Sequence, residues 1–112
     1  MLAYSLLFLG DHMIKHIVFW RLDSTFDAAT KEAKAIEAKQ RLEALAGQIP
    51  ALLAIEVGIN FNATDGASDF VLYTEFATRE DLDSYQQHPQ HVALVPFIVS
   101  ITEERRVVDY QL

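Results

Sequence analysis

The pattern of hydrophobic and polar residues predicts three β-strands before residue 77. Ile14–Leu22 is rich in β-branched and aromatic side chains and stops at a polar cluster, as a strand does where it runs into a loop. Residues 54–61 alternate with a period of two, so one face of this segment is expected to be buried. Its hydrophobic positions are Ile55, Val57, Ile59 and Phe61. Residues 70–76 form a third hydrophobic run, and the turn-forming segment before it predicts a hairpin.

A helix is predicted between the first two strands, over residues 27–46. Hydrophobic residues recur there at steps of three and four, which places them on one side of a helix. They are Ala35, Ala38, Leu42, Leu45 and Ile49. Asp27 is expected to cap the first turn, because its carboxylate can accept hydrogen bonds from the unpaired amides there. Gly47 and Pro50 are expected to end the helix.

The last third of the chain predicts an interrupted helix and a final strand. Thr78 is the expected N-cap, Pro89 breaks the helix, residues 92–98 add a further turn or two, and residues 105–110 form the strand. The resulting order β-α-β-β-α-β is the split βαβ arrangement of an α+β, ferredoxin-like fold. Such a fold has a four-stranded antiparallel sheet with its helices on one face.

The sheet face without helices is expected to be covered by a second copy of the chain. The first strand carries hydrophobic side chains on both of its faces, with Ile17 and Phe19 opposite Val18 and Trp20. Two such sheets packed face to face bury both surfaces and close a barrel-like core. The sequence therefore predicts a homodimer.

Composition narrows the partners and the compartment. The chain has 112 residues, and 9 Lys or Arg against 16 Asp or Glu give a net charge of −7. This acidity disfavours nucleic acids and anionic membranes as partners. The lack of cysteine excludes disulfides and thiolate chemistry and favours a cytoplasmic location. Residues 1–12 begin with a hydrophobic stretch far shorter than a membrane span, so we expect an arm or an upstream start before one domain over residues 13–112.

Several short motifs follow one another in a distinctive order between residue 13 and the C-terminus. They are Lys15-His16-Ile17-Val18, Ile49-Pro50-Ala51, Glu56-Val57-Gly58, Tyr85 with His88-Pro89-Gln90-His91-Val92, and Val108-Asp109-Tyr110. In this combination the chain resembles the stress-responsive A/B barrel domain (Dabb) family. The resemblance implies ferredoxin-like protomers that dimerise into an α-β barrel.

The resemblance also implies a chemistry. Enzymes of this family are similar to polyketide cyclases, which close a poly-β-keto chain by aldol chemistry without a metal or organic cofactor. Their acid–base residues correspond to Tyr85 and His91, and His16 and His88 correspond to positions near the cleft. A small hydrophobic carbonyl compound is then the expected ligand. Two alternatives remain: a non-enzymatic, stress-linked structural or interaction protein, and a cofactor-free monooxygenase or degradation enzyme, the last by analogy of fold alone.

The chemistry of these side chains allows both a catalytic and a structural role. An imidazole ionises near neutral pH and can act as a base, and a tyrosine hydroxyl can donate to an oxyanion. Equally, His91 can brace the break at Pro89 while Tyr85 packs in the core. Trp20, like the phenylalanines of the strands, is a candidate either to line a ligand pocket or to belong to the core.

Two further sets of residues carry candidate chemistry. His16, His88 and His91 could supply three metal ligands, but no carboxylate spacing marks a fourth, so no metal is expected. The strand carboxylates Glu56, Glu75 and Asp109 are either functional groups or partners in cross-strand or interface pairs.

Overall fold

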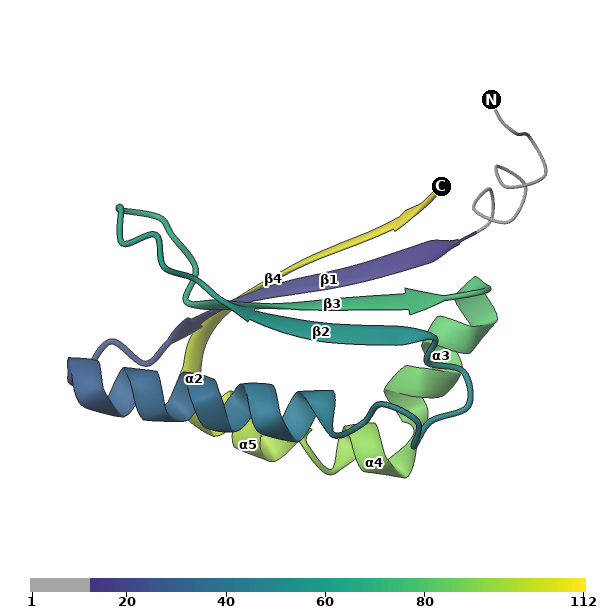
Figure 1. Ribbon diagram of the computed structural model, residues 1–112, viewed down its shortest axis with the longest axis horizontal. Coiled ribbons are helices and arrows are strands. Elements are labelled where there is room, and N and C mark those ends of the chain that lie inside the picture. The colour runs from purple at the N-terminus through teal and green to yellow at the C-terminus, as the bar shows by residue number, and fades with distance from the viewer. Residues whose placement is uncertain (1–12) are drawn as a thin grey trace.

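A four-stranded antiparallel sheet carries helices on one face, and its other face is open (Figure 1). The computed structural model describes residues 13–112, so the predicted arm over residues 1–12 lies outside the described residues. The strands are β1 (Ile14–Leu22), β2 (Ala54–Ile59), β3 (Phe70–Phe76) and β4 (Thr102–Gln111), in the order β2-β3-β1-β4. The helices are α2 (Ala28–Glu43), α3 (Arg79–Gln87), α4 (Pro89–Val92) and α5 (Val95–Ile101). The predicted ferredoxin-like fold is confirmed.

β1 lies in the interior of the sheet, between β3 and β4, and its side chains alternate between the two faces. The face under the helices buries Ile14, His16, Val18, Trp20 and Leu22. This face makes the hydrophobic core together with the buried side of α2 and with residues of β3, α3 and α5. The open face of β1 carries Lys15, Ile17, Phe19 and Arg21.

The first helix begins as predicted and ends earlier. The Asp27 carboxylate accepts a hydrogen bond from the Thr30 amide at 2.7 Å, which confirms the predicted cap. α2 ends at Glu43 rather than at residue 46, because the amides of Leu45, Ala46 and Gln48 bond three residues back in successive turns. Gly47 takes the left-handed conformation, with φ of 77°, within these turns.

The second strand is shorter than its hydrophobic alternation predicts. Its hydrogen-bonded ladder with β3 ends at the pair Ile59 and Phe70. The chain then turns through a loop in which the Asn60 side-chain amide donates a hydrogen bond to the Ser68 carbonyl. Phe61 is fully exposed and Ile59 is 44% exposed, so their predicted burial on one face of the strand is wrong. The final strand, β4, is longer than the predicted range of residues 105–110. The last helix, α5, begins and ends three residues later than the helical segment predicted over residues 92–98. Within residues 13–112 no helix combines the length and apolarity that crossing a membrane requires.

Helix α2 protects the outer edge of β2 through two charged side chains. The Glu43 carboxylate accepts a hydrogen bond from the Val57 amide at 2.9 Å, and the Lys39 ammonium donates to the Val57 carbonyl at 2.6 Å. The same two side chains form an ion pair at 2.8 Å. Hydrogen bonds from Lys39 and Val57 lower the pKa of Glu43. Backbone groups of an edge strand that would otherwise face water are thereby paired.

We predict that Glu43→Ala lowers the free energy of unfolding by about 1 kcal/mol, because the Val57 amide loses its partner. Urea unfolding monitored by circular dichroism measures this. The difference in unfolding free energy between the natural protein and Glu43→Ala should narrow as the pH falls below 4.5. The pKa of Glu43 is lowered in the folded protein, so its carboxylate stabilises the fold above its ordinary pKa. That stabilisation is lost when the carboxylate is protonated. Glu37→Ala is the control, because Glu37 on the same helix forms only surface ion pairs. An equal loss of unfolding free energy in the two variants would contradict a stabilising contact between Glu43 and the edge of β2.

Candidate active site

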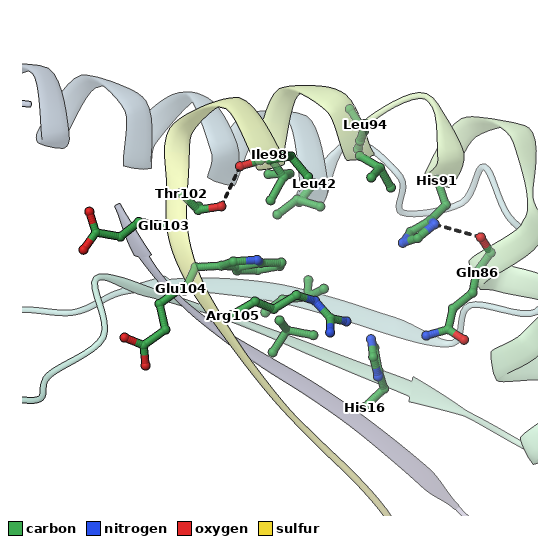
Figure 2. Close-up of a pocket in the computed structure, with 15 residues that line it drawn as sticks. His16, Leu42, Gln86, His91, Leu94, Ile98, Thr102, Glu103, Glu104 and Arg105 are labelled. Atoms are coloured by element: carbon green, nitrogen blue, oxygen red, sulfur yellow. Dashed lines mark hydrogen bonds between the residues drawn. The ribbon is translucent and has the colours of Figure 1, made fainter. Parts of the chain in front are cut away.

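A cavity of about 410 Å³ lies between the sheet and the helices α4 and α5 (Figure 2). Its floor comes from β1 and β3, and one wall comes from the beginning of β4. Most of its lining is apolar: Val18, Trp20, Leu42, Leu72, Leu94, Val95, Ile98 and Val99. The polar lining residues are His16, Gln86, His91, Thr102, Glu103, Glu104 and Arg105. A mainly apolar pocket with a few convergent polar groups is typical of sites for small organic molecules.

His91 stands on α4, the short helix that Pro89 starts after α3 has ended. Its Nδ1 lies 3.0 Å from the Gln86 carbonyl oxygen, which can only accept, so Nδ1 carries the proton of the neutral ring. Nε2 is then left with a free lone pair, and Figure 2 shows the ring facing the cavity. Burial lowers the pKa of His91 below its usual 6.5, with smaller contributions from the charges of His16 and Arg105. At neutral pH His91 is therefore an unprotonated base.

His16 faces the same cavity from the middle of the sheet and is only 2% exposed. Its Nδ1 lies 2.5 Å from Oδ1 of Asp109, the residue directly opposite on β4. The carboxylate can only accept, so Nδ1 donates to it. On the other side, the Thr74 hydroxyl donates to the His16 carbonyl at 2.8 Å. The Asp109 contact fixes the ring and leaves Nε2 for the cavity, while the Thr74 contact holds the His16 backbone.

Tyr85 is completely buried next to the two histidines, although it is not among the residues that line the cavity. Its ring centroid lies 4.6 Å from that of His91 and 6.4 Å from that of His16. Burial raises the pKa of Tyr85 to about 12, so the hydroxyl keeps its proton at neutral pH. Among residues 13–112 this hydroxyl is the one buried side-chain polar atom without a hydrogen-bond partner.

The other candidates from the sequence lie in different surroundings. Trp20 lines the cavity and stacks on Phe70, with 4.9 Å between ring centroids. His88 does not line it, and its Nδ1 instead accepts from the Gln90 amide at 3.1 Å and caps α4. In the described part of the chain, no three His, Cys, Asp or Glu residues are grouped to hold a metal ion. The strand carboxylate Glu75 pairs across the sheet with Lys15 at 2.7 Å.

No motif in the sequence singles out Arg105 or Gln86, and the sequence alone leaves the partner of Asp109 open. Gln86 acts through its backbone carbonyl, which no side-chain pattern can reveal. Asp109 is paired with His16 by the register of two strands far apart in the sequence. Arg105 lines the cavity next to Glu103 and Glu104, so three consecutive residues share one wall. A register shift opposite Arg21 and Leu22 interrupts the alternation there.

The fold and the cavity define a ferredoxin-like α+β protein with histidines facing a largely apolar pocket. The chain belongs to the stress-responsive A/B barrel domain family, whose model matches residues 14–112. A comparison with curated proteins found no significant match.

Solved structures support this assignment. A dimeric protein of unknown function with a ferredoxin-like fold from Bacteroides fragilis is 34% identical, with a TM-score of 0.81 over 89% of this chain and 96% of that one. A Dabb family protein from Mesorhizobium loti is 25% identical, with a TM-score of 0.69 over 90% and 97% of the two chains. The hydroxynitrile lyase from Passiflora edulis is 15% identical, with a TM-score of 0.73 over 91% and 94%, and shares the fold.

We predict that Tyr85→Phe leaves the free energy of unfolding within about 0.5 kcal/mol of the natural value, or raises it, because the removed hydroxyl has no partner. Tyr85→Ala should cost about 3–5 kcal/mol through the cavity that it leaves. Chemical denaturation of both variants measures this. A loss of more than about 1 kcal/mol in Tyr85→Phe would mean that the hydroxyl is hydrogen-bonded in the folded protein.

Proposed function

We propose that this protein is a cofactor-free acid–base catalyst that removes and returns a proton next to the carbonyl group of a small hydrophobic compound. The observation that carries the proposal is the state of His91: its Nδ1 is tied to a backbone carbonyl, its Nε2 is free at the cavity, and its pKa is lowered. A neutral imidazole in a largely apolar pocket is suited to general base catalysis at neutral pH.

Tyr85 supplies the complementary donor. When a base takes a proton from the carbon next to a carbonyl group, negative charge develops on the carbonyl oxygen. The Tyr85 hydroxyl keeps its proton, has no hydrogen-bond partner among residues 13–112 and lies beside His91, just behind the cavity lining. For the proposed reaction the substrate oxygen has to reach it there, and the hydroxyl can then donate without first breaking another hydrogen bond. The enolate can then attack a second carbonyl group, as in aldol ring closure, or recover the proton from His91. Neither step transfers an electron, so no redox cofactor is needed.

His16 and Asp109 form a second polar pair at the same cavity. The carboxylate orients the ring, as the aspartate does in other His–Asp pairs. Nε2 of His16 is thereby presented to the cavity as a further polar contact for the substrate. The apolar lining accounts for the rest of the proposed ligand, because it removes a hydrocarbon or aromatic group from water. The open, histidine-lined cavity favours this proposal over a purely structural role.

We also propose that two copies of this protein form a homodimer in which the open faces of their sheets pack together. Hydrophobic residues from three strands gather on this face: Ile17, Phe19, Val71, Val108 and Tyr110. Exposed fractions of 49% for Val108 and 44% for Tyr110 leave apolar surface in water that a partner would cover. Several similar solved structures are described as dimeric, including the 34% identical protein from Bacteroides fragilis.

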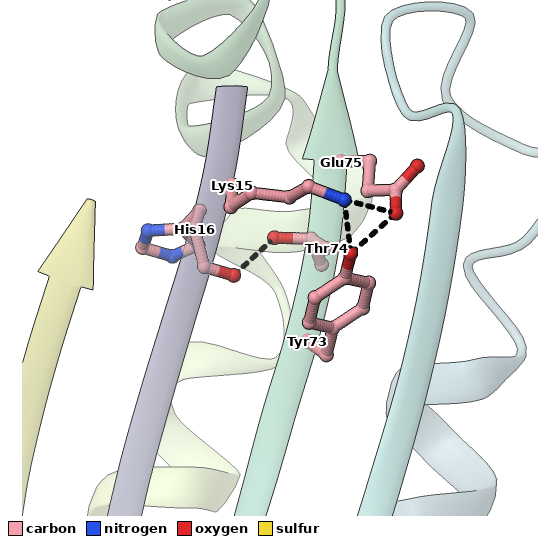
Figure 3. Close-up of polar contacts among 5 residues, drawn as sticks. All are labelled: Lys15, His16, Tyr73, Thr74 and Glu75. Carbon is pink, nitrogen blue, oxygen red and sulfur yellow. Dashed lines mark hydrogen bonds and ion pairs between the residues drawn. The ribbon is translucent and has the colours of Figure 1, made fainter. Parts of the chain in front are cut away.

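A charged cluster on the open face is compatible with burial in a dimer. Lys15 bonds to Glu75 at 2.7 Å, and Tyr73 is hydrogen-bonded to both side chains (Figure 3). The hydrogen bond to Glu75 raises the pKa of Lys15, and the one from Lys15 lowers the pKa of Glu75, so both stay charged. Because the opposite charges already satisfy one another, a partner surface does not have to supply a counter-charge.

We predict that the protein catalyses hydrogen–deuterium exchange at carbon atoms next to a carbonyl group. Apolar ketones and their carboxylated analogues, propiophenone and benzoylpropionate among them, are incubated in deuterium oxide and followed by NMR. His91→Ala should slow the exchange by about a hundredfold or more, since the base is removed. The rate should rise with pH through a midpoint below 6.5, because only the unprotonated ring accepts a proton and its pKa is lowered.

His88→Asn is the matched control for this experiment. His88 belongs to the same motif but does not line the cavity, and asparagine can still cap α4, so exchange should continue at the natural rate. Tyr85→Phe should slow the exchange, although this variant is expected to be as stable as the natural protein. Absence of exchange with every compound, or an undiminished rate in His91→Ala, would refute the proposed function.

We predict that Ile17→Arg converts the dimer into a folded monomer, because it places a charge in the middle of the apolar open face. Analytical ultracentrifugation at micromolar concentration measures the mass, and circular dichroism checks the fold. Val92→Arg is the control, since Val92 is exposed on α4, away from the open face of the sheet. A monomeric natural protein would disprove the dimer.

A further inference from the structure

Arg105 gives the cavity a positive charge that the proposed chemistry does not use. Within residues 13–112 it is the only Lys or Arg that lines the cavity, and it lies opposite Trp20 in the register of β4 with β1. Figure 2 shows its side chain running from β4 toward His16. Its charge is close enough to His91 to contribute to the lowered pKa of that ring. The guanidinium is therefore near the acid–base residues.

Nearby carboxylates are engaged elsewhere and leave Arg105 without an ion pair. Glu104 pairs with Arg106 at 2.9 Å, and Glu103 accepts from the Ser24 amide at 2.6 Å. Asp109, four residues along the same strand, is held by His16. Among residues 13–112, Arg105 has no carboxylate within ion-pair distance. A guanidinium presents several donors that match the two oxygens of a carboxylate.

We propose that Arg105 binds the carboxylate of the substrate, so that the natural ligand is a small apolar oxo acid whose carbonyl group lies beside His91. This inference rests on the proposed function and narrows its substrate class. The aromatic or alkyl part of the acid packs on the apolar wall, and the carboxylate faces β4. Glu103 and Glu104 at the same wall repel a multiply charged group, so a single negative charge fits better than a phosphate.

Paired binding measurements test the role of Arg105 without requiring turnover. Benzoylpropionate and its neutral counterpart benzoylpropionamide have the same apolar group and the same ketone, so their affinities differ only through the carboxylate. Isothermal titration calorimetry with the full-length protein should show about tenfold tighter binding of the acid. Arg105→Gln should abolish this preference and leave the affinity for the amide unchanged. Arg79→Gln, which removes the same charge away from the cavity, should keep the preference.

The outcomes separate this inference from the proposed function. Equal binding of the two compounds, binding of neither, or a preference for the acid that survives in Arg105→Gln would overturn the role of Arg105. Deuterium exchange into neutral ketones would then still support acid–base catalysis. Conversely, an acid preference that depends on Arg105, found together with no exchange into any compound, would sustain the carboxylate site and refute the catalysis.

Discussion

The register of β1 between β3 and β4 is the constraint on which the candidate site depends. Side chains on a strand alternate between faces, so a slip of one residue would move His16 from the cavity to the open face and bring Lys15 under the helices. Burial of alternate residues along β1, from Ile14 to Leu22, makes such a slip costly. The hydrophobic effect thus fixes the position of a polar group, and the pair formed by His16 and Asp109 follows from it.

Most elements of the fold could be predicted from local patterns, because the hydrophobic periods of strand and helix and the caps at Asp27 and Thr78 are local signals. Periodicity failed where it continued past the end of the hydrogen-bonded ladder: Phe61 keeps the period of β2 but has no neighbouring strand to bury it. Pairing, rather than sequence pattern alone, decides where a strand ends.

The candidate site was predictable only in part. The motif containing Tyr85 and His91 drew attention to two side chains that the fold brings together, with ring centroids 4.6 Å apart. The contact of His91 with a backbone carbonyl has no signature in the sequence. Neither does the position of Arg105 beside the cavity, because it depends on the pairing of β4 with β1, two strands far apart in the sequence. Both depend on tertiary geometry.

The contact of Lys39 and Glu43 with β2 makes the two edges of the sheet unequal. On the β2 side, backbone groups at the centre of the edge strand are already bonded to a helix. On the β4 side, the strand pairs only with β1 among residues 13–112, and no other strand of this range lies along its outer backbone groups. A strand from another molecule is therefore expected to add at the β4 edge of the sheet rather than at the β2 edge. This holds for a domain-swapped assembly and for the first step of aggregation. The β4 edge also carries residues that line the cavity.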